Sequence, residues 1–196
     1  MDSTLTLELP TSTILHVTPE QFEAIATANR DLRLERTSLG ELIVNPPTGG
    51  ESSQRNFSIT TQLGIWLEAN PDLGEGFDSS GGFVFPNGAI RSPDASWIQR
   101  ERWQALTAEQ RRGFVPLCPD FVVELRSSSD SLTKLQQKMQ EYLENGAQLG
   151  WLINPQNQQA EIYRPGKAVA VLDHPLELSG EPVLPGFILN LRRIWR

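Results

Sequence analysis

The chain has 196 residues, with 17 Lys and Arg against 24 Asp and Glu, so its formal net charge is −7. Hydrophobic residues make up 38% of the sequence and charged residues 21%, which is typical of a globular protein and excludes a disordered composition. A single cysteine, Cys118, excludes an internal disulfide, and two histidines, His16 and His174, are too few for the usual zinc sites. Any metal would therefore be held by oxygen ligands.

The length predicts one domain over residues 1–196, in which residues 1–17 form an extended N-terminal arm. No apolar run is long enough to span a bilayer, and the first residues lack the basic and apolar regions of a secretory signal. A soluble cytoplasmic protein is expected. The sequence pI near 4.9 argues against strong nonspecific binding of nucleic acid, which depends on Lys and Arg.

The first half of the chain predicts a helix, a hairpin and a second helix. Thr18 and Pro19, with a glutamine three positions after the threonine, form the pattern of a capping box that begins a helix. Residues 32–37 and 40–45 alternate in polarity around a turn, which predicts a β-hairpin. Residues 51–70 place apolar side chains at mixed helical spacings and predict the longest helix of this half.

The second half predicts consecutive strands and then a strand-helix-strand unit. Short apolar runs separated by glycine predict strands within residues 81–99, and the almost unbroken apolar run in 116–127 predicts a central strand covered on both faces. Residues 130–145 carry one apolar stripe and predict a helix, which Ser129 or Asp130 caps and Gly146 ends. A strand at residues 148–155 follows, and then a hairpin and a final edge element. The order predicts a mixed α/β sheet.

Two carboxylates, Asp94 and Glu124, lie inside apolar strand-like runs. A buried carboxylate is costly unless it is paired, and Arg91 and Arg126 are available as partners. Alternatively, acidic groups on adjacent central strands form an oxygen-lined pocket suited to Mg²⁺ or Mn²⁺. Side chains two positions apart share one face of a strand, so Glu124 and Arg126 point the same way and Leu125 points oppositely.

The helix at residues 130–145 brings two lysines back over the sheet. Either Lys134 or Lys138 can direct an ammonium group toward the pocket, and because one helical turn separates them, we expect only one to reach it.

The motifs Pro93-Asp94 and Glu124-Leu125-Arg126 resemble the PD-(D/E)XK nuclease superfamily, with arginine at the position of the motif lysine. The longer run over residues 119–155, together with residues 46–56 and 91–98, is similar to the large bacterial family of Uma-type "putative restriction endonucleases". The resemblance covers most of the chain, from about residue 20 to 190.

This resemblance implies a restriction-endonuclease-like mixed β-sheet flanked by helices, with added N- and C-terminal hairpins. It implies that Asp94, Glu124 and the backbone carbonyl of Leu125 hold Mg²⁺ or Mn²⁺, and that Glu51 is a third acid near the metal. Lys138 occupies the position from which the family takes its lysine, where it would orient the attacking water or deprotonate it after its pKa is lowered.

The implied activity is endonucleolytic hydrolysis of DNA phosphodiester bonds. Arg126 would contact the scissile phosphate or hold Glu124, but arginine is a poor general base because it stays protonated. The small size of the acidic chain suggests that it binds a DNA duplex as a homodimer. Two alternatives remain: a catalytically inactive binding or assembly module of the same fold, and hydrolysis of another phosphodiester or a glycosidic bond by the same two carboxylates.

Overall fold

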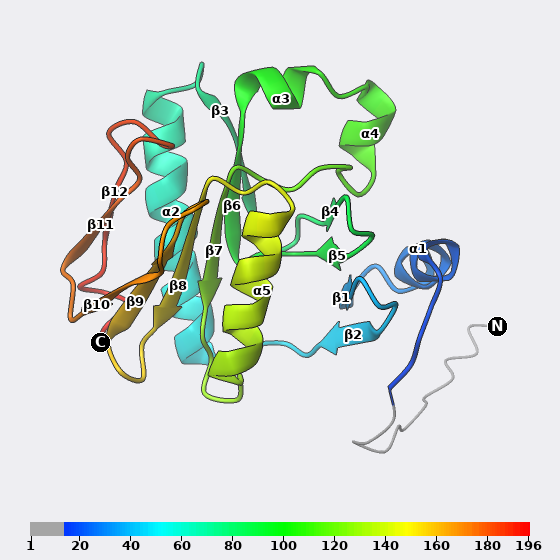
Figure 1. Ribbon diagram of the computed structural model, residues 1–196, viewed down its shortest axis with the longest axis horizontal. Helices are drawn as coiled ribbons and strands as arrows, with labels where there is room; N and C mark the ends of the chain where they lie inside the picture. Colours follow the sequence, from blue (N-terminus) through cyan, green and yellow to red (C-terminus); the bar gives the residue numbers. More distant parts are fainter. Residues whose placement is uncertain (1–13) are drawn as a thin grey trace.

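The computed structural model describes residues 14–196 and contains a central six-stranded mixed sheet (Figure 1). The predicted arm at residues 1–17 lies largely outside the described residues; within it, His16 forms a β-bridge to Glu41. Strands β7 and β8 are parallel, and their neighbours in the sheet are antiparallel, which confirms the predicted mixed α/β sheet. The strand order is β10 (Ala170–Asp173), β9 (Gln159–Tyr163), β8 (Leu149–Asn154), β7 (Phe121–Leu125), β6 (Ala95–Gln99) and β3 (Gly74–Asp78).

Two smaller antiparallel sheets accompany the central one. The predicted first hairpin is confirmed as β1 and β2, which join β5 and β4 in a four-stranded sheet. The last two strands form a separate two-stranded sheet, so the expected final edge element is wrong. Leu178 and Leu189 of these strands are buried in the core, and the strands do not pair with the edge of the large sheet. The bounds are β1 (Arg33–Arg36), β2 (Leu42–Asn45), β4 (Phe83–Val84), β5 (Ile90–Arg91), β11 (Glu177–Ser179) and β12 (Ile188–Asn190).

Helices cover both faces of the central sheet, with α5 in front of it and α2 behind it in Figure 1. The predicted helices are present as α1 (Pro19–Ala28), α2 (Gly50–Ala69) and α5 (Leu132–Glu144), and two short helices, α3 (Arg100–Gln104) and α4 (Ala108–Arg112), follow β6. Within residues 14–196, every helix is too short or too polar to cross a membrane.

The local signals for helix ends act mostly as predicted. Thr18 and Gln21 form the capping box of α1. The N-cap of α5 is Ser131, however, and neither Ser129 nor Asp130. Asp130 instead accepts a hydrogen bond from the backbone N–H of Ser127 at 2.8 Å, so its carboxylate closes a turn before the helix begins.

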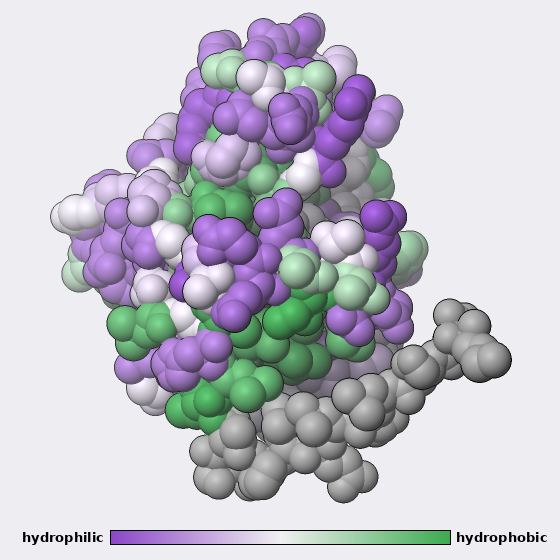
Figure 2. Space-filling model, turned by 90° about the vertical axis from the view of Figure 1, so that its right-hand side faces the viewer, coloured by the Kyte–Doolittle hydropathy of each residue, from purple (hydrophilic) through white to green (hydrophobic). Residues whose placement is uncertain are grey.

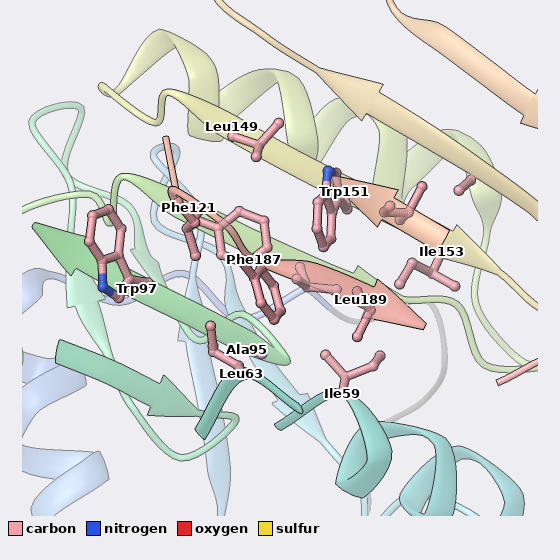
Figure 3. Close-up of a cluster of buried hydrophobic side chains, with 14 of the residues drawn as sticks. Ile59, Leu63, Ala95, Trp97, Phe121, Leu149, Trp151, Ile153, Phe187 and Leu189 are labelled. Atoms are coloured by element: carbon pink, nitrogen blue, oxygen red, sulfur yellow. The ribbon is translucent and has the colours of Figure 1, made fainter. Parts of the chain in front are cut away.

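The core on the α2 side is aromatic and is shown in Figure 3. Trp151 of β8 stacks on Phe187 with 5.9 Å between the ring centroids, and Phe121 of β7 meets Trp151 edge-on at 4.8 Å. Phe187 and Leu189 belong to the last hairpin, which therefore covers this face of the sheet together with α2.

Alternate residues of β7 point to opposite faces of the sheet. Phe121, Val123 and Leu125 pack in the core on the α2 side, whereas Val122 packs in the core that contains Met139 and Tyr142 of α5. Glu124 lies two positions after Val122, so its side chain projects toward α5. The residue that interrupts the apolar strand is thus directed at a helix and away from the aromatic core.

The surface on the side where α1 lies is mixed in character (Figure 2). Hydrophilic side chains cover its upper part, and hydrophobic side chains gather in its lower part. Several large apolar residues of the first hairpin and its surroundings are exposed: Ile14, Leu15, Leu32, Leu39 and Val44.

The buried thiol of Cys118 gives a first prediction. Burial raises the pKa of Cys118 to about 12, and its Sγ lies 3.5 Å from the carbonyl oxygen of Tyr142. Because the thiolate is the reactive form, the folded protein will not react with Ellman's reagent at pH 8. Unfolding in guanidinium will release one reactive thiol per chain. Rapid colour development without denaturant would contradict this placement.

Candidate active site

A polar pocket with a volume of about 680 Å³ lies at the carboxyl ends of β7 and β8. Its walls are the segments that follow these strands, the loop between β2 and α2, and strand β1. The acidic and basic side chains of the pocket include Arg33, Glu35, Asp94, Glu124 and Lys138.

Asp94 reaches the pocket because β6 runs antiparallel to β7. The register pairs Ala95 with Val123, so Asp94, one residue earlier, lies where β7 ends. Its backbone N–H donates to the carbonyl of Val123 at 3.0 Å, and its Oδ2 accepts from the N–H of Leu125 at 2.8 Å. Burial raises the pKa of Asp94, and the Leu125 N–H only partly offsets this. The Pro-Asp motif is thereby fixed to the strand that carries the second acid.

Glu124 is held by two donors from α5. Lys138 Nζ lies 2.8 Å from Glu124 Oε1, and the hydroxyl of Tyr142 donates to the same oxygen at 2.6 Å. Lys138 and Tyr142 are four positions apart, so they share one face of the helix. The structure therefore brings Asp94, Glu124 and Lys138 together in one pocket. Lys134, one turn earlier, is exposed.

A third carboxylate, Glu35 of β1, completes the group and was missed by the sequence reasoning. Its Oε1 accepts from Lys138 Nζ at 2.9 Å and from the N–H of Ser92 at 3.1 Å. Arg91 lies 3.2 Å from Glu35 Oε2 and also pairs with Glu141 of α5. The hairpin pattern places Glu35 on the polar side of its strand, and no local signal indicates that α5 covers that side.

The charges of this group control its pKa values. Burial raises the pKa of Glu124 to about 7, although the Lys138 ammonium opposes this rise. Burial would also raise the pKa of Glu35, but Lys138 and Arg91 together hold it below its usual value. Burial alone would lower the pKa of Lys138, whereas Glu124 and Glu35 raise it well above its usual range. Without a bound metal, the two carboxylates thus stabilise the ammonium form of Lys138, in the opposite direction to the lowered pKa expected beside a metal.

The two arginines that sequence reasoning offered as partners of the acids bind elsewhere. Arg91 pairs with Glu35 and Glu141, and the guanidinium near Asp94 is that of Arg33, 3.7 Å from Oδ1. Arg126 donates to the carbonyl oxygen of Asp130 at 3.2 Å and to Asn154 Oδ1 at 3.4 Å.

The hydrogen bonds of Arg126 therefore stabilise the turn after β7. The expectation that Arg126 holds Glu124 is wrong, because α5 supplies the donors to that carboxylate.

Glu51 lies at the rim of the pocket, in the first turn of α2. Its side chain is 83% exposed and pairs with Arg55 at 3.3 Å. Within residues 14–196, no three Asp, Glu, His or Cys side chains form a ready metal-ligating group. The structure thus does not bring Glu51 together with Asp94 and Glu124.

The donor set of the pocket fits a hard divalent cation with an incomplete protein shell. Glu124 Oε1 is used by Lys138 and Tyr142, and Asp94 Oδ2 is used by Leu125. Within residues 14–196, the second oxygen of each carboxylate accepts no hydrogen bond, and Leu125 also lines the pocket. Magnesium uses few protein oxygens and keeps several waters, so this set suits it.

The buried position of Lys138 gives a second prediction. Lys138→Met leaves Glu35 and Glu124 without their shared cation, so we expect the free energy of unfolding to fall by about 3–5 kcal/mol. The matched change Lys134→Met, on the exposed side of the same helix, will alter it by less than about 0.5 kcal/mol. Urea denaturation at pH 7 measures both, and equal stabilities would contradict the buried ion group.

Comparisons with known proteins agree with this picture. The model of the Uma2 family, described as "Putative restriction endonuclease", matches residues 19–192. Among solved structures, the chain is similar to the crystal structure of "a putative nuclease belonging to DUF820" from Anabaena variabilis, with a TM-score of 0.69 and 22% identity over 83% of this chain and 89% of that chain. At this identity the likeness shows a shared fold.

No functionally curated protein gives a significant match. The family model nevertheless covers almost the whole chain and confirms the resemblance found in the motifs. The chain belongs to the Uma2 family.

Proposed function

We propose that this protein is a Mg²⁺- or Mn²⁺-dependent endonuclease that hydrolyses phosphodiester bonds of DNA. The observation that carries the proposal is the placement of Asp94, Glu124 and Lys138 in one pocket of a chain from this family. The pocket contains acidic oxygens for a cation and basic side chains for an anion, which is the combination that phosphodiester hydrolysis requires.

Asp94, Glu124 and the carbonyl oxygen of Leu125 would hold the cation. When bound, a divalent cation lowers the pKa of a bound water and offsets charge that develops on the phosphate. The protein's contribution is to fix these oxygens. The Leu125 N–H orients Asp94, and the Tyr142 hydroxyl orients Glu124.

Lys138 acts in this proposal as a hydrogen-bond donor and not as a base. An ammonium group has three donors, and Glu124 and Glu35 accept two of them. The third donor remains for a water molecule or a phosphate oxygen in the pocket. Its raised pKa keeps this donor protonated at neutral pH.

A second candidate is a binding or assembly module that has lost catalysis. The specific observation in its favour is that the Lys138 ammonium already pairs with both Glu124 and Glu35. Arginine at position 126 also replaces the motif lysine, and its guanidinium stabilises the turn after β7.

Metal titration and cleavage test the nuclease proposal. The changes Glu124→Gln and Asp94→Asn preserve shape but remove a charged ligand. We expect either one to abolish saturable Mg²⁺ binding in calorimetry and to reduce plasmid cleavage by roughly 100-fold or more.

The matched control is Glu75→Gln, an exposed carboxylate on β3 outside the pocket, which will bind metal and cleave like the wild type. Circular dichroism confirms that each variant is folded. Absence of metal binding and cleavage in the wild type would favour the inactive module.

We propose that residues 1–196 act as one domain and assemble as a homodimer on DNA. The exposed apolar residues Leu32, Leu39 and Val44 of the first hairpin support such a contact, and the face on the α1 side carries an apolar area (Figure 2). Light scattering will give twice the chain mass of 21.9 kDa. A mass of one chain, with or without a DNA duplex, would contradict the dimer.

A further inference from the structure

Three arginines line the pocket within residues 14–196, and two of them are used by the protein itself. Arg55 donates to the carbonyl oxygens of Ile194 at 3.0 Å and Arg196 at 2.9 Å, which fastens the last residues of the chain to α2. Arg126 is bonded within the turn after β7. The donors of these two side chains thus stabilise the pocket walls.

Arg33 differs from both because its donors have weak partners or none. Its Nη2 lies 3.5 Å from the carbonyl oxygen of Ser92, at the limit of a hydrogen bond, and 3.7 Å from Asp94 Oδ1. Its Nε is buried and finds no hydrogen-bond partner among residues 14–196. A guanidinium carries five N–H donors, and leaving the buried Nε–H of Arg33 unsatisfied costs free energy.

A second orphaned atom lines the same pocket. The Oδ1 atom of Asn56, on α2, is buried without a partner. Among the described residues, five buried side-chain nitrogen or oxygen atoms lack partners, and two of them, in Arg33 and Asn56, belong to this pocket. Buried polar groups in native proteins are normally satisfied, so the unpartnered N–H of Arg33 indicates a ligand that accepts a hydrogen bond, whereas Asn56 Oδ1 is itself an acceptor and needs a donor such as water.

The charge of the pocket specifies what kind of ligand this is. The three acids of the pocket repel an anion, and Lys138 pairs with two of them, Glu124 and Glu35. An anionic ligand therefore needs a further positive group to bind to. Arg33 adds a guanidinium beside Asp94, with its side chain 32% exposed. A planar guanidinium binds two oxygens of a phosphate at once.

We propose that Arg33 binds the non-bridging oxygens of a nucleic-acid backbone phosphate and positions that phosphate beside Asp94. This assignment rests on the proposed nuclease function for the identity of the substrate. It transfers to Arg33 the phosphate contact that the sequence had suggested for Arg126.

The test compares Arg33→Gln and Arg33→Lys with wild type for binding to a fluorescent DNA duplex in EDTA, where cleavage is suppressed. Fluorescence anisotropy is measured over a series of salt concentrations. The logarithm of the binding constant falls with the logarithm of the salt concentration, and loss of one phosphate contact will reduce the magnitude of this slope by about one. We expect Arg33→Gln to weaken binding about 10-fold and Arg33→Lys, which keeps the charge, to retain most of the slope.

The matched control is Arg112→Gln on α4, which removes an exposed arginine outside the pocket and will leave the slope unchanged. Thermal unfolding shows whether each variant is folded. An unchanged slope in a folded Arg33→Gln variant would overturn the assignment, and so would a wild type that does not bind the duplex. A merely structural role of Arg33 would alter the unfolding temperature without altering the slope.

Two further arms separate the possible failures. Calorimetry with inorganic phosphate detects a site for the free anion. If Arg33→Gln abolishes the heat of phosphate binding but leaves the salt slope of duplex binding unchanged, the backbone assignment is overturned. Cleavage in Mg²⁺ tests the nuclease proposal by itself. A wild type that does not cleave, together with a reduced slope in Arg33→Gln, would remove the nuclease and keep Arg33 as a backbone contact.

Discussion

The buried ammonium of Lys138 is the interaction on which the candidate site depends. It lies 2.8 Å from Glu124 of the central sheet and 2.9 Å from Glu35 of the four-stranded sheet, while its own helix covers both. One cation thus joins the four-stranded sheet to the central sheet and to α5, although Glu35 is 103 positions from Lys138. Buried carboxylates are tolerated only when they are paired, so each part depends on the others for its charge balance.

This arrangement gives the three acids of the pocket different pKa values. Lys138 and Arg91 hold the pKa of Glu35 low, whereas burial raises the pKa values of Glu124 and Asp94. Glu35 therefore stays ionised, whereas a further positive charge would stabilise the ionised forms of Glu124 and Asp94. A divalent cation is a chemically suitable source of that charge, and a fixed ammonium beside it is suited to donate a hydrogen bond.

The geometry of the β-strands is enough to orient Asp94 and Glu124. Alternation along β7 directs Glu124 at α5 while its neighbours pack in the aromatic core, and the antiparallel register with β6 places Asp94 against the N–H of Leu125. The helix then needs only the four-residue spacing of Lys138 and Tyr142 to reach Glu124. The same packing that buries the aliphatic core consequently orients the acids.

The sequence by itself determined helices α1, α2 and α5, the first hairpin, the strand-helix-strand unit and the two acids, because these depend on local periodicity, caps and turn residues. Only the tertiary structure decided the role of Glu35, which is 103 positions from Lys138, and the different bonding of Arg33 and Arg126. It also decided that the last hairpin covers the sheet instead of extending its edge. The physical reason is that periodicity shows which residues share a face of an element, whereas the element that covers this face is fixed by packing between segments far apart in the chain.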